Sequence, residues 1–460
     1  MIAAALYKGF TGDFMYDRQT IRKQIFYLMI PIILENFLQL LTNLIATAMV
    51  GRLTEMDISA QGMCTKIVDI IYFIFRGAGT ALVILVAKKF AQEKVAQCRT
   101  IFQWTAASIV VIGIVLGTIL FIQPYFWLRL FTNDTELILW ASKYIRILLL
   151  CLPFWGVMLA ISSVFQGKGD TKTPMFIAAG VNVINIFLCY GLIFGHFGLP
   201  EMGFLGAAVS LVVSRIVGCA AGLILLYNRK FGLFSFKEKG EPVPGVLKEI
   251  YSIGLPNAGE AIIWQFASIL LSRVILSYGQ DAFAAYQLGV QSEYITEIPA
   301  IGFTVAATSL ISRSIGLRDA EMFQTCKVEL VRICTMISVV TSALLIFLPK
   351  MFMDLLTDNE VLTRIGIPYV MIMGTIQIPQ NLIKIYGGIL RSANYKTTPL
   401  LVQMIGTWGI RIPTCLLCAY VLHLPIYAIW ICIAADQLTK FLLIRYFTDQ
   451  KQIHTKIETL

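Results

Sequence analysis

The sequence predicts an all-helical membrane protein with twelve membrane-spanning helices in two halves of six. Three observations predict this fold class. Of the 460 residues, 57% are hydrophobic and only 14% are charged, whereas a soluble domain has roughly 25% charged residues. Apolar runs long enough to cross a membrane recur along the whole chain. Several prolines and a glutamate of the first half also recur 225 residues later.

The apolar runs predict helices rather than the strands of a barrel, because they are long, unbroken and without alternation. Several of them exceed the ~20 residues needed to cross a membrane, so we expect these helices to tilt or protrude. The predicted spans cover residues 25–48, 60–87, 100–122, 138–163, 174–196, 203–226, 249–277, 283–312, 326–348, 365–390, 399–422 and 424–446.

The basic residues predict the orientation. Lys and Arg gather in the first arm, in the loops after the even-numbered spans and in the tail. Arg391 and Lys396, at the end of span 10, are assigned to the loop that follows it. By the positive-inside rule both termini are cytoplasmic. We see no cleavable signal peptide. The predicted organisation is a cytoplasmic arm (1–24), a first lobe (25–226), a cytoplasmic linker (227–248), a second lobe (249–446) and a cytoplasmic tail (447–460).

The internal repeat is carried best by prolines. Sliding the chain by 225 residues places Pro31, Pro124 and Pro174 on Pro256, Pro349 and Pro399, and it places Glu35 on Glu260. Three of the four prolines in residues 31–174 therefore meet a proline. Because each half has an even number of spans, both halves enter the membrane the same way round. Some secondary transporters have such parallel repeats.

Composition argues against catalysis. The three histidines lie near helix ends or in the tail, and the ten cysteines lie mostly inside apolar runs. We therefore expect no catalytic residue, no metal site and no cofactor, and a membrane enzyme is disfavoured. The net charge of +10 fits cytoplasmic loops rather than nucleic-acid binding.

Several motifs together resemble the multidrug and toxic compound extrusion (MATE) family, of bacterial type. They are "MVGRLTEMDISAQG" after span 1, "QGKGDTKTP" after span 4 with its weaker copy "SANYKTTP" after span 10, the stretch from Ala284 to Gly316, and "WGIRIP" in span 11. Their order and spacing cover nearly the whole chain.

The resemblance implies two six-helix lobes facing each other across a central cavity. It implies a secondary transporter of the inner (plasma) membrane that exports organic solutes or drugs by antiport with H⁺ or Na⁺, while one lobe rocks against the other. The expected partners are a small organic substrate, the coupling cation and the lipid bilayer, with a functional monomer. The alternative from the same superfamily is a lipid-linked oligosaccharide flippase, and a passive channel is disfavoured by the repeat.

One position departs from the family. Many members carry an Asp five residues before the glycine that matches Gly51, and here that position is Ala46. The coupling site must use another group or lie in the other lobe.

Acidic residues inside spans are the candidates for that role. An ionisable side chain at the bilayer centre costs about 2.5–3.5 kcal/mol or more, so each needs a reason. The cation-coupling candidates are Glu35, Glu260, Glu293 and Asp69. Hydrogen-bonded struts are the alternative for the first two, and a structural pair with Arg76 is the alternative for Asp69. Glu297, one turn after Glu293, is a weaker candidate.

Polar residues that share faces with these acids are candidates for the cavity lining. In the family a span 7 carboxylate often acts about one turn beyond Glu260, near Trp264. Lys384, together with Arg273, favours an anionic or zwitterionic substrate. The cavity and substrate candidates are Gln39, Asn43, Trp264, Gln287, Gln291, Gln377, Asn381 and Lys384.

Arg411 and Asp436 lie about midway along successive spans, so their depths match. We interpret them as a structural ion pair that joins spans 11 and 12.

Overall fold

The computed structural model describes residues 18–228, 234, 240–451 and 453. Most of the arm, the middle of the linker and the end of the tail lie outside the described residues. The helices are α2 (Arg18–Val50), α3 (Glu55–Ala91), α4 (Val95–Ile122), α5 (Pro124–Leu128), α6 (Thr135–Leu149), α7 (Leu152–Lys168), α8 (Lys172–Phe194), α9 (Phe204–Leu226), α10 (Val246–Leu276), α11 (Gln280–Leu317), α12 (Ala320–Phe347), α13 (Pro349–Asp354), α14 (Glu360–Ser392), α15 (Thr398–Met404), η1 (Ile405–Arg411), α16 (Ile412–Leu416), η2 (Leu417–Val421) and α17 (Ile426–Gln450).

The all-helical prediction is confirmed over the described ranges. Eleven helices there are long and apolar enough to cross a membrane, or twelve when the bent pair α6 and α7 counts as one span. That pair is bent by 45°, next to Pro153, which cannot donate a backbone hydrogen bond. The first helix begins at Arg18, seven residues before the predicted span, so the end of the arm is helical.

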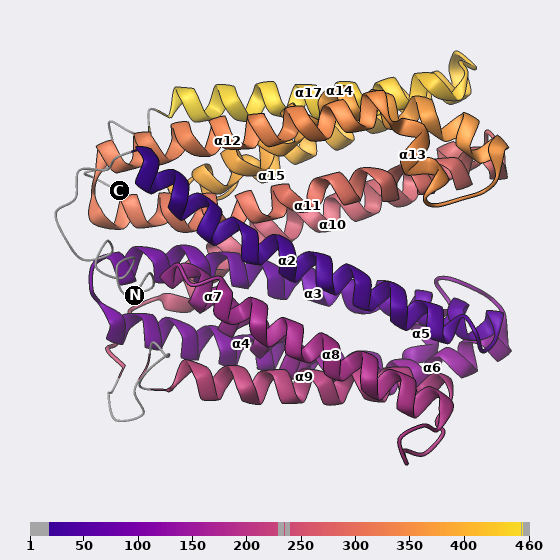
Figure 1. Ribbon diagram of the computed structural model, residues 1–460, viewed down its shortest axis with the longest axis horizontal. Helices are drawn as coiled ribbons and strands as arrows, with labels where there is room; N and C mark the ends of the chain where they lie inside the picture. The colour runs from indigo at the N-terminus through magenta and orange to yellow at the C-terminus, as the bar shows by residue number, and fades with distance from the viewer. Residues whose placement is uncertain (1–17, 229–233, 235–239, 452, 454–460) are drawn as a thin grey trace.

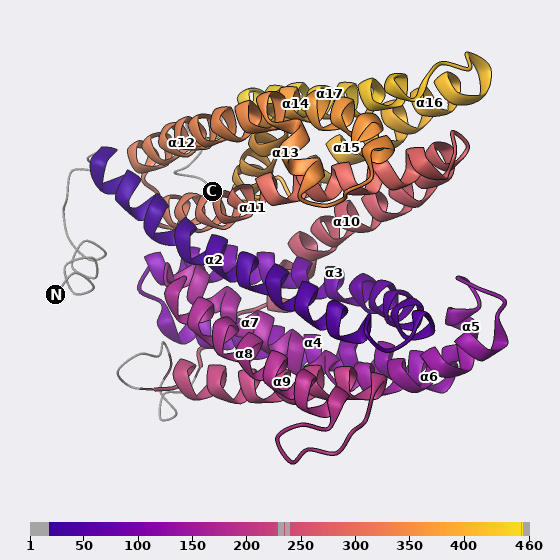
Figure 2. The same cartoon turned by 45° about the vertical axis from the view of Figure 1, so that its right-hand side comes forward.

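The helices form two bundles (Figures 1 and 2). One contains α2 to α9 and the other contains α10 to α17. The two bundles lie close together at the end where α2 begins and diverge toward the opposite end (Figure 2). By the predicted orientation the close end is cytoplasmic.

Helix α2 packs on both bundles. Its first half places Ile21, Ile25, Leu28 and Met29 in the apolar core of α11, α12 and α14. Its second half runs along α8 of the first bundle (Figure 1). The first span therefore holds the two bundles together at the close end.

Backbones meet directly where the bundles touch. A Cβ atom added at Gly77 of α3 would collide with the carbonyl oxygen of Gly254 in α10. Further along, Gln92 donates to the carbonyl of Gly316 over 3.2 Å. Glycine is required at these positions because no side chain fits between the helices.

A second contact between the bundles is ionic. Arg22 of α2 lies 2.6 Å (Nε to Oε2) and 3.3 Å (Nη2 to Oε1) from Glu329 of α12. The side chain of Glu329 is only 1% exposed. Such a two-pronged pair fixes the relative position of two helices as well as their charges.

Span 11 is not a regular α-helix. It contains two π-helical segments, η1 and η2, that flank the single α-helical turn of α16. The π-helix is rare and is frequently found at functional sites. Gly406 is the second residue of η1, and a Cβ atom added there would collide with Asp436 of α17.

Candidate functional site

A polar network fills the middle of the second bundle, between α11 and α14. The amide of Gln380 donates to both Glu293 and Glu297 over 2.7 Å each. Lys384 donates to Glu297 over 2.7 Å, and the hydroxyl of Tyr369 donates to Glu293 over 2.8 Å. Two carboxylates one turn apart thus share a single amide.

The two acids of this network have different environments. Glu297 forms an ion pair with Lys384. The contacts that the structure gives to the carboxylate of Glu293 come from neutral donors, and the nearby cation Arg411 is already bound to Asp436. A carboxylate with no cation of its own in a low-dielectric site is the one that gains most from binding a proton or a metal cation.

The buried amides of α14 extend the network. Gln377 donates to Thr296 over 3.3 Å, and Asn381 donates to Ser338 of α12 over 2.9 Å. Gln377 is fully buried. These two predicted cavity residues therefore contact helices of their own bundle, whereas Lys384 is 29% exposed.

Glu260 lies apart from this network and has a cation of its own. Nη1 of Arg391 lies 3.0 and 3.2 Å from its two carboxylate oxygens. The prediction that counted Arg391 as a loop charge is wrong, because its side chain is only 7% exposed and it extends from the last turn of α14 into the bundle.

Glu35 lies in the first bundle with one carboxylate oxygen, Oε2, buried and without a hydrogen-bond partner. The buried guanidinium of Arg215 in α9 lies within electrostatic range. Arg215 stacks over Trp155 at 5.3 Å, and Trp155 stacks on Tyr72 at 4.3 Å. Glu35, Arg215 and two aromatic rings therefore lie close together in the first bundle.

The polar stripe after Glu35 bonds within its own helix. Gln39 donates to Asn43 over 2.9 Å, and this pair is exposed. Asp69 is half-buried and Arg76 is exposed, and they form no ion pair. That alternative for Asp69 was wrong because seven residues separate the two side chains by about 10 Å along a helix.

Three further cavity candidates lie on faces between the bundles. Gln287 and Gln291 are exposed. Gln291 lies eleven residues before Gly302, which is about three helical turns, so Gln291 and Gly302 share one face of α11. At Gly302 an added Cβ would lie 2.8 Å from Met29 of α2. Trp264, 43% exposed, lies seven residues after Asn257, which donates to Thr80 of α3.

The predicted structural pair forms, with a third member. Arg411 lies 2.7 Å from Asp436, and Lys440 lies 2.9 Å from the same carboxylate oxygen. All three side chains are at most 8% exposed. One buried acid thus binds two basic side chains between spans 11 and 12.

The residues that sequence reasoning missed at these sites are mainly partners of the acids. Arg215 could have been found, because it stands alone in the apolar run "LVVSRIVG" and a charge inside a span needs a reason. Tyr369 carries no such signal. No group of three or more His, Cys, Asp or Glu side chains that could hold a metal ion occurs within the described ranges.

Two bundles of six spans, related by a sequence repeat and containing buried carboxylates, define a multi-pass membrane transporter built from a duplicated unit. Comparison with known families agrees, since a single family model matches residues 31–191 and again residues 256–417. The chain belongs to the MatE family, whose members are transporters and not enzymes.

Similar proteins span the same length. The chain is 27% identical over 424 residues to a probable multidrug resistance protein NorM of Thermotoga maritima, covering 90% of this chain and 89% of that one. It is 24% identical over 450 residues to a probable multidrug resistance protein YoeA of Bacillus subtilis, covering 94% and 95%.

Solved structures share the fold. One is described as the outward-facing conformation of a multidrug resistance MATE family transporter, with a TM-score of 0.87, 17% identity and coverage of 97% of this chain and 100% of that one. A transporter of Pyrococcus furiosus, described as having a binding pocket of reversed polarity, gives the same values.

Proposed function

We propose that this protein exports organic solutes, drugs among them, across the inner membrane in exchange for inward movement of H⁺ or Na⁺. The relatives named as probable multidrug resistance proteins support the class of substrate. The observation that carries the coupling is Glu293, a carboxylate held by neutral donors beside the charge-balanced pair of Glu297 and Lys384.

The geometry supports a mechanism in which α11 links ion binding to the lobes. A cation that binds Glu293 changes its bonds to Tyr369 and Gln380, and hence the packing of α11 on α14. The same helix contacts the first bundle at Gly302, and Ser309 donates to the carbonyl of Gln166 over 3.0 Å. If the ion binds one arrangement of the lobes more tightly than the other, its binding shifts the equilibrium toward that arrangement.

The groups around Glu293 suit either ion once one amide turns over. The amide of Gln380 donates to Glu293 through Nε2, while its Oε1 is buried without a hydrogen-bond partner. Turning this amide by 180° would let Oε1 accept a hydrogen bond from a protonated Glu293. For Na⁺, which needs several oxygen ligands, the carboxylate, the hydroxyl of Tyr369 and the turned Oε1 would be the first three. Glu260 is the weaker candidate because Arg391 already balances its charge, and Glu35 stays a candidate for the first bundle.

The test uses purified protein in liposomes with an imposed pH or Na⁺ gradient and ethidium as the transported probe. We expect wild type to move ethidium against its gradient with one of the two ions, and Glu293→Gln to lose this movement. Glu260→Gln and Glu35→Gln are measured separately. The matched control is Glu321→Gln, an exposed acid in the first turn of α12, which should transport as wild type does.

Full gradient-driven transport by Glu293→Gln contradicts the assignment of the coupling site. No gradient-driven movement of cationic, anionic or zwitterionic probes by wild type contradicts antiport itself. The flippase alternative predicts that a lipid-linked oligosaccharide in the same liposomes is translocated while the soluble probes are not.

A further inference from the structure

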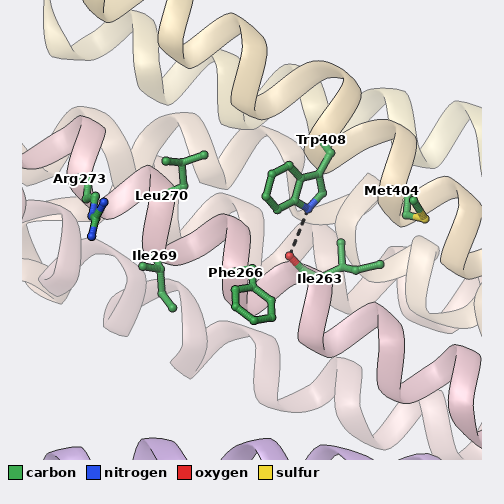
Figure 3. A pocket seen from close by; sticks show the side chains of 7 residues that line it. All are labelled: Ile263, Phe266, Ile269, Leu270, Arg273, Met404 and Trp408. Atoms are coloured by element: carbon green, nitrogen blue, oxygen red, sulfur yellow. Dashed lines mark hydrogen bonds between the residues drawn. The ribbon is translucent and has the colours of Figure 1, made fainter. Parts of the chain in front are cut away.

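A cavity of about 600 Å³ lies between α10 and span 11, away from the polar networks. Its wall on α10 is apolar, made by Ile263, Phe266, Ile269 and Leu270 (Figure 3). Met404 and Trp408 form the wall on span 11, and the indole of Trp408 donates to the carbonyl of Ile263 over 3.4 Å. We call this cavity the α10 groove.

The α10 groove faces the membrane and not the space between the bundles. Phe266 lies nine residues after Asn257, which is two and a half turns at 3.6 residues per turn, so the two side chains point in opposite directions. Asn257 contacts Thr80 of the other bundle. Phe266 and Ile269 are 59% and 51% exposed, as expected of side chains that lie against lipid.

The groove has one charged end. Arg273 lies at the opposite end of the row from Met404 (Figure 3), one turn before α10 ends at Leu276. The structure gives Arg273 no ion pair. Arg273 lines this groove and not the space between the bundles, so its grouping with Lys384 as a guide to substrate charge has no support from its position. By the predicted orientation it lies at the outer surface, with Ile263 about 15 Å deeper at 1.5 Å per residue.

We propose that the α10 groove is a binding site for a phospholipid of the outer leaflet, with anionic headgroups preferred. An apolar cavity open to hydrocarbon offers water no polar partners and is filled by an acyl chain. The phosphate lies at the depth of Arg273, whose guanidinium is the side chain best suited to two-pronged phosphate recognition. A second anionic group on the lipid adds attraction to this otherwise unpaired cation.

The π-helical turn η1 supports a built site. It forms the part of span 11 that contains Trp408. In this wide turn, side chains three residues apart point to two different surroundings. Arg411 binds Asp436 in the bundle interior, while Trp408 lies on the groove. A bound chain in contact with Trp408 would thus press on the same wide turn that holds the buried triad of Arg411, Asp436 and Lys440.

The test measures quenching of tryptophan fluorescence by brominated lipids, with the full-length protein in nanodiscs. In one series, an increasing fraction of brominated phosphatidylglycerol is mixed with unbrominated phosphatidylcholine. In the comparison series, brominated phosphatidylcholine is mixed with unbrominated phosphatidylglycerol. We expect Trp408→Phe to remove a saturable component of the quenching, and Trp104→Phe, which removes a tryptophan that is 53% exposed on α4, to leave that component in place. We expect Arg273→Gln to raise the half-saturating lipid fraction about fivefold, and Arg129→Gln, an exposed cation of the other bundle at the same predicted surface, to leave it unchanged.

Three results would each overturn the proposal. They are equal quenching by the two lipids in wild type, loss of the saturable component in both tryptophan variants, and an unchanged half-saturation in Arg273→Gln. Because the groove lies apart from Glu293, the transport assay and this assay can fail independently. Both arginine variants change exposed residues, and an unaltered unfolding temperature verifies that they are folded.

Discussion

Asp436 joins spans 11 and 12 through two buried ion pairs. Its carboxylate lies within 2.9 Å of both Arg411 and Lys440 and is fully buried. Breaking a buried ion pair by removing one partner costs roughly 3–5 kcal/mol, because the other charge is left buried and alone. Here two basic side chains would lose the acid that they share.

We therefore predict that Asp436→Asn strongly destabilises the protein. Thermal unfolding in detergent should show a lower midpoint for this variant. Asp449→Asn on the same helix is the control, because that acid is 60% exposed and its ion pairs are 3.8 and 3.9 Å long. An equal effect of the two substitutions would show that the burial of Asp436 is unimportant.

At the residue scale, sequence patterns predicted the buried acids but not their partners. Arg411 and Asp436 were found together because they share a depth on successive spans. Arg391 was assigned to a loop because it ends a helix, and a one-dimensional pattern does not reveal that its side chain points back toward Glu260. The contact of Tyr369 with Glu293 depends on how α14 rotates against α11, which periodicity alone does not determine.

At the scale of elements, α2 is the helix that joins the two bundles. Its buried face in the second bundle includes Ile25, which is fully buried, whereas Ile30 on the same helix is 50% exposed. Packing within a membrane depends on close contact rather than on removal from water. Ile25 and Ile30 have the same hydrophobicity but differ in protein contact. Substituting each one therefore measures the effect of contact alone.

We predict that Ile25→Ala destabilises the fold by roughly 2 kcal/mol, the lower end of the range for such changes, because lipid also accepts apolar side chains. Ile30→Ala should change stability little. Unfolding in mixed micelles of dodecyl maltoside and sodium dodecyl sulfate measures both. Equal losses would place Ile25 against lipid and contradict the packing of α2 on the second bundle.

The element boundaries illustrate what hydropathy can and cannot predict. Most spans were predicted to within a few residues, because the apolar runs end at charged or proline-containing turns. The break between α6 and α7, the π-helical turns of span 11 and the early start of α2 were missed. The break lies at Pro153, and the π-helical turn η1 contains the contact of Gly406 with Asp436. The hydropathy of a single run reveals neither feature.

At the scale of the whole molecule, the contact of Gly77 with Gly254 favours the arrangement in which the bundles meet at the predicted cytoplasmic end. We predict that Gly77→Ala shifts the protein away from this arrangement, since a methyl group has no room there. Double electron–electron resonance between labels at Leu130 and Val421, exposed residues at the far ends of the two bundles, measures the shift as a larger population of shorter distances. Unnatural amino acids carry the labels, because the chain has ten native cysteines.

The control for this prediction lies on the same helix. A Cβ atom added at Gly62 meets nothing within 4 Å, so Gly62→Ala should leave the distance distribution of wild type. A shift of equal size in both variants would assign the effect to helix propensity rather than to the contact between bundles.

The shared packing of α2 has a consequence for how the protein is made. Arg22 and Glu329 are separated by 307 residues, so at about 5–20 residues per second the ribosome adds the partner roughly 15–60 s after α2 is synthesised. During that interval the first half of α2 has neither its ion pair nor its apolar neighbours from α11 and α12. A nascent chain of six spans is then not a finished half, although the repeat makes it look like one, and membrane chaperones or proteases would meet it in this incomplete state.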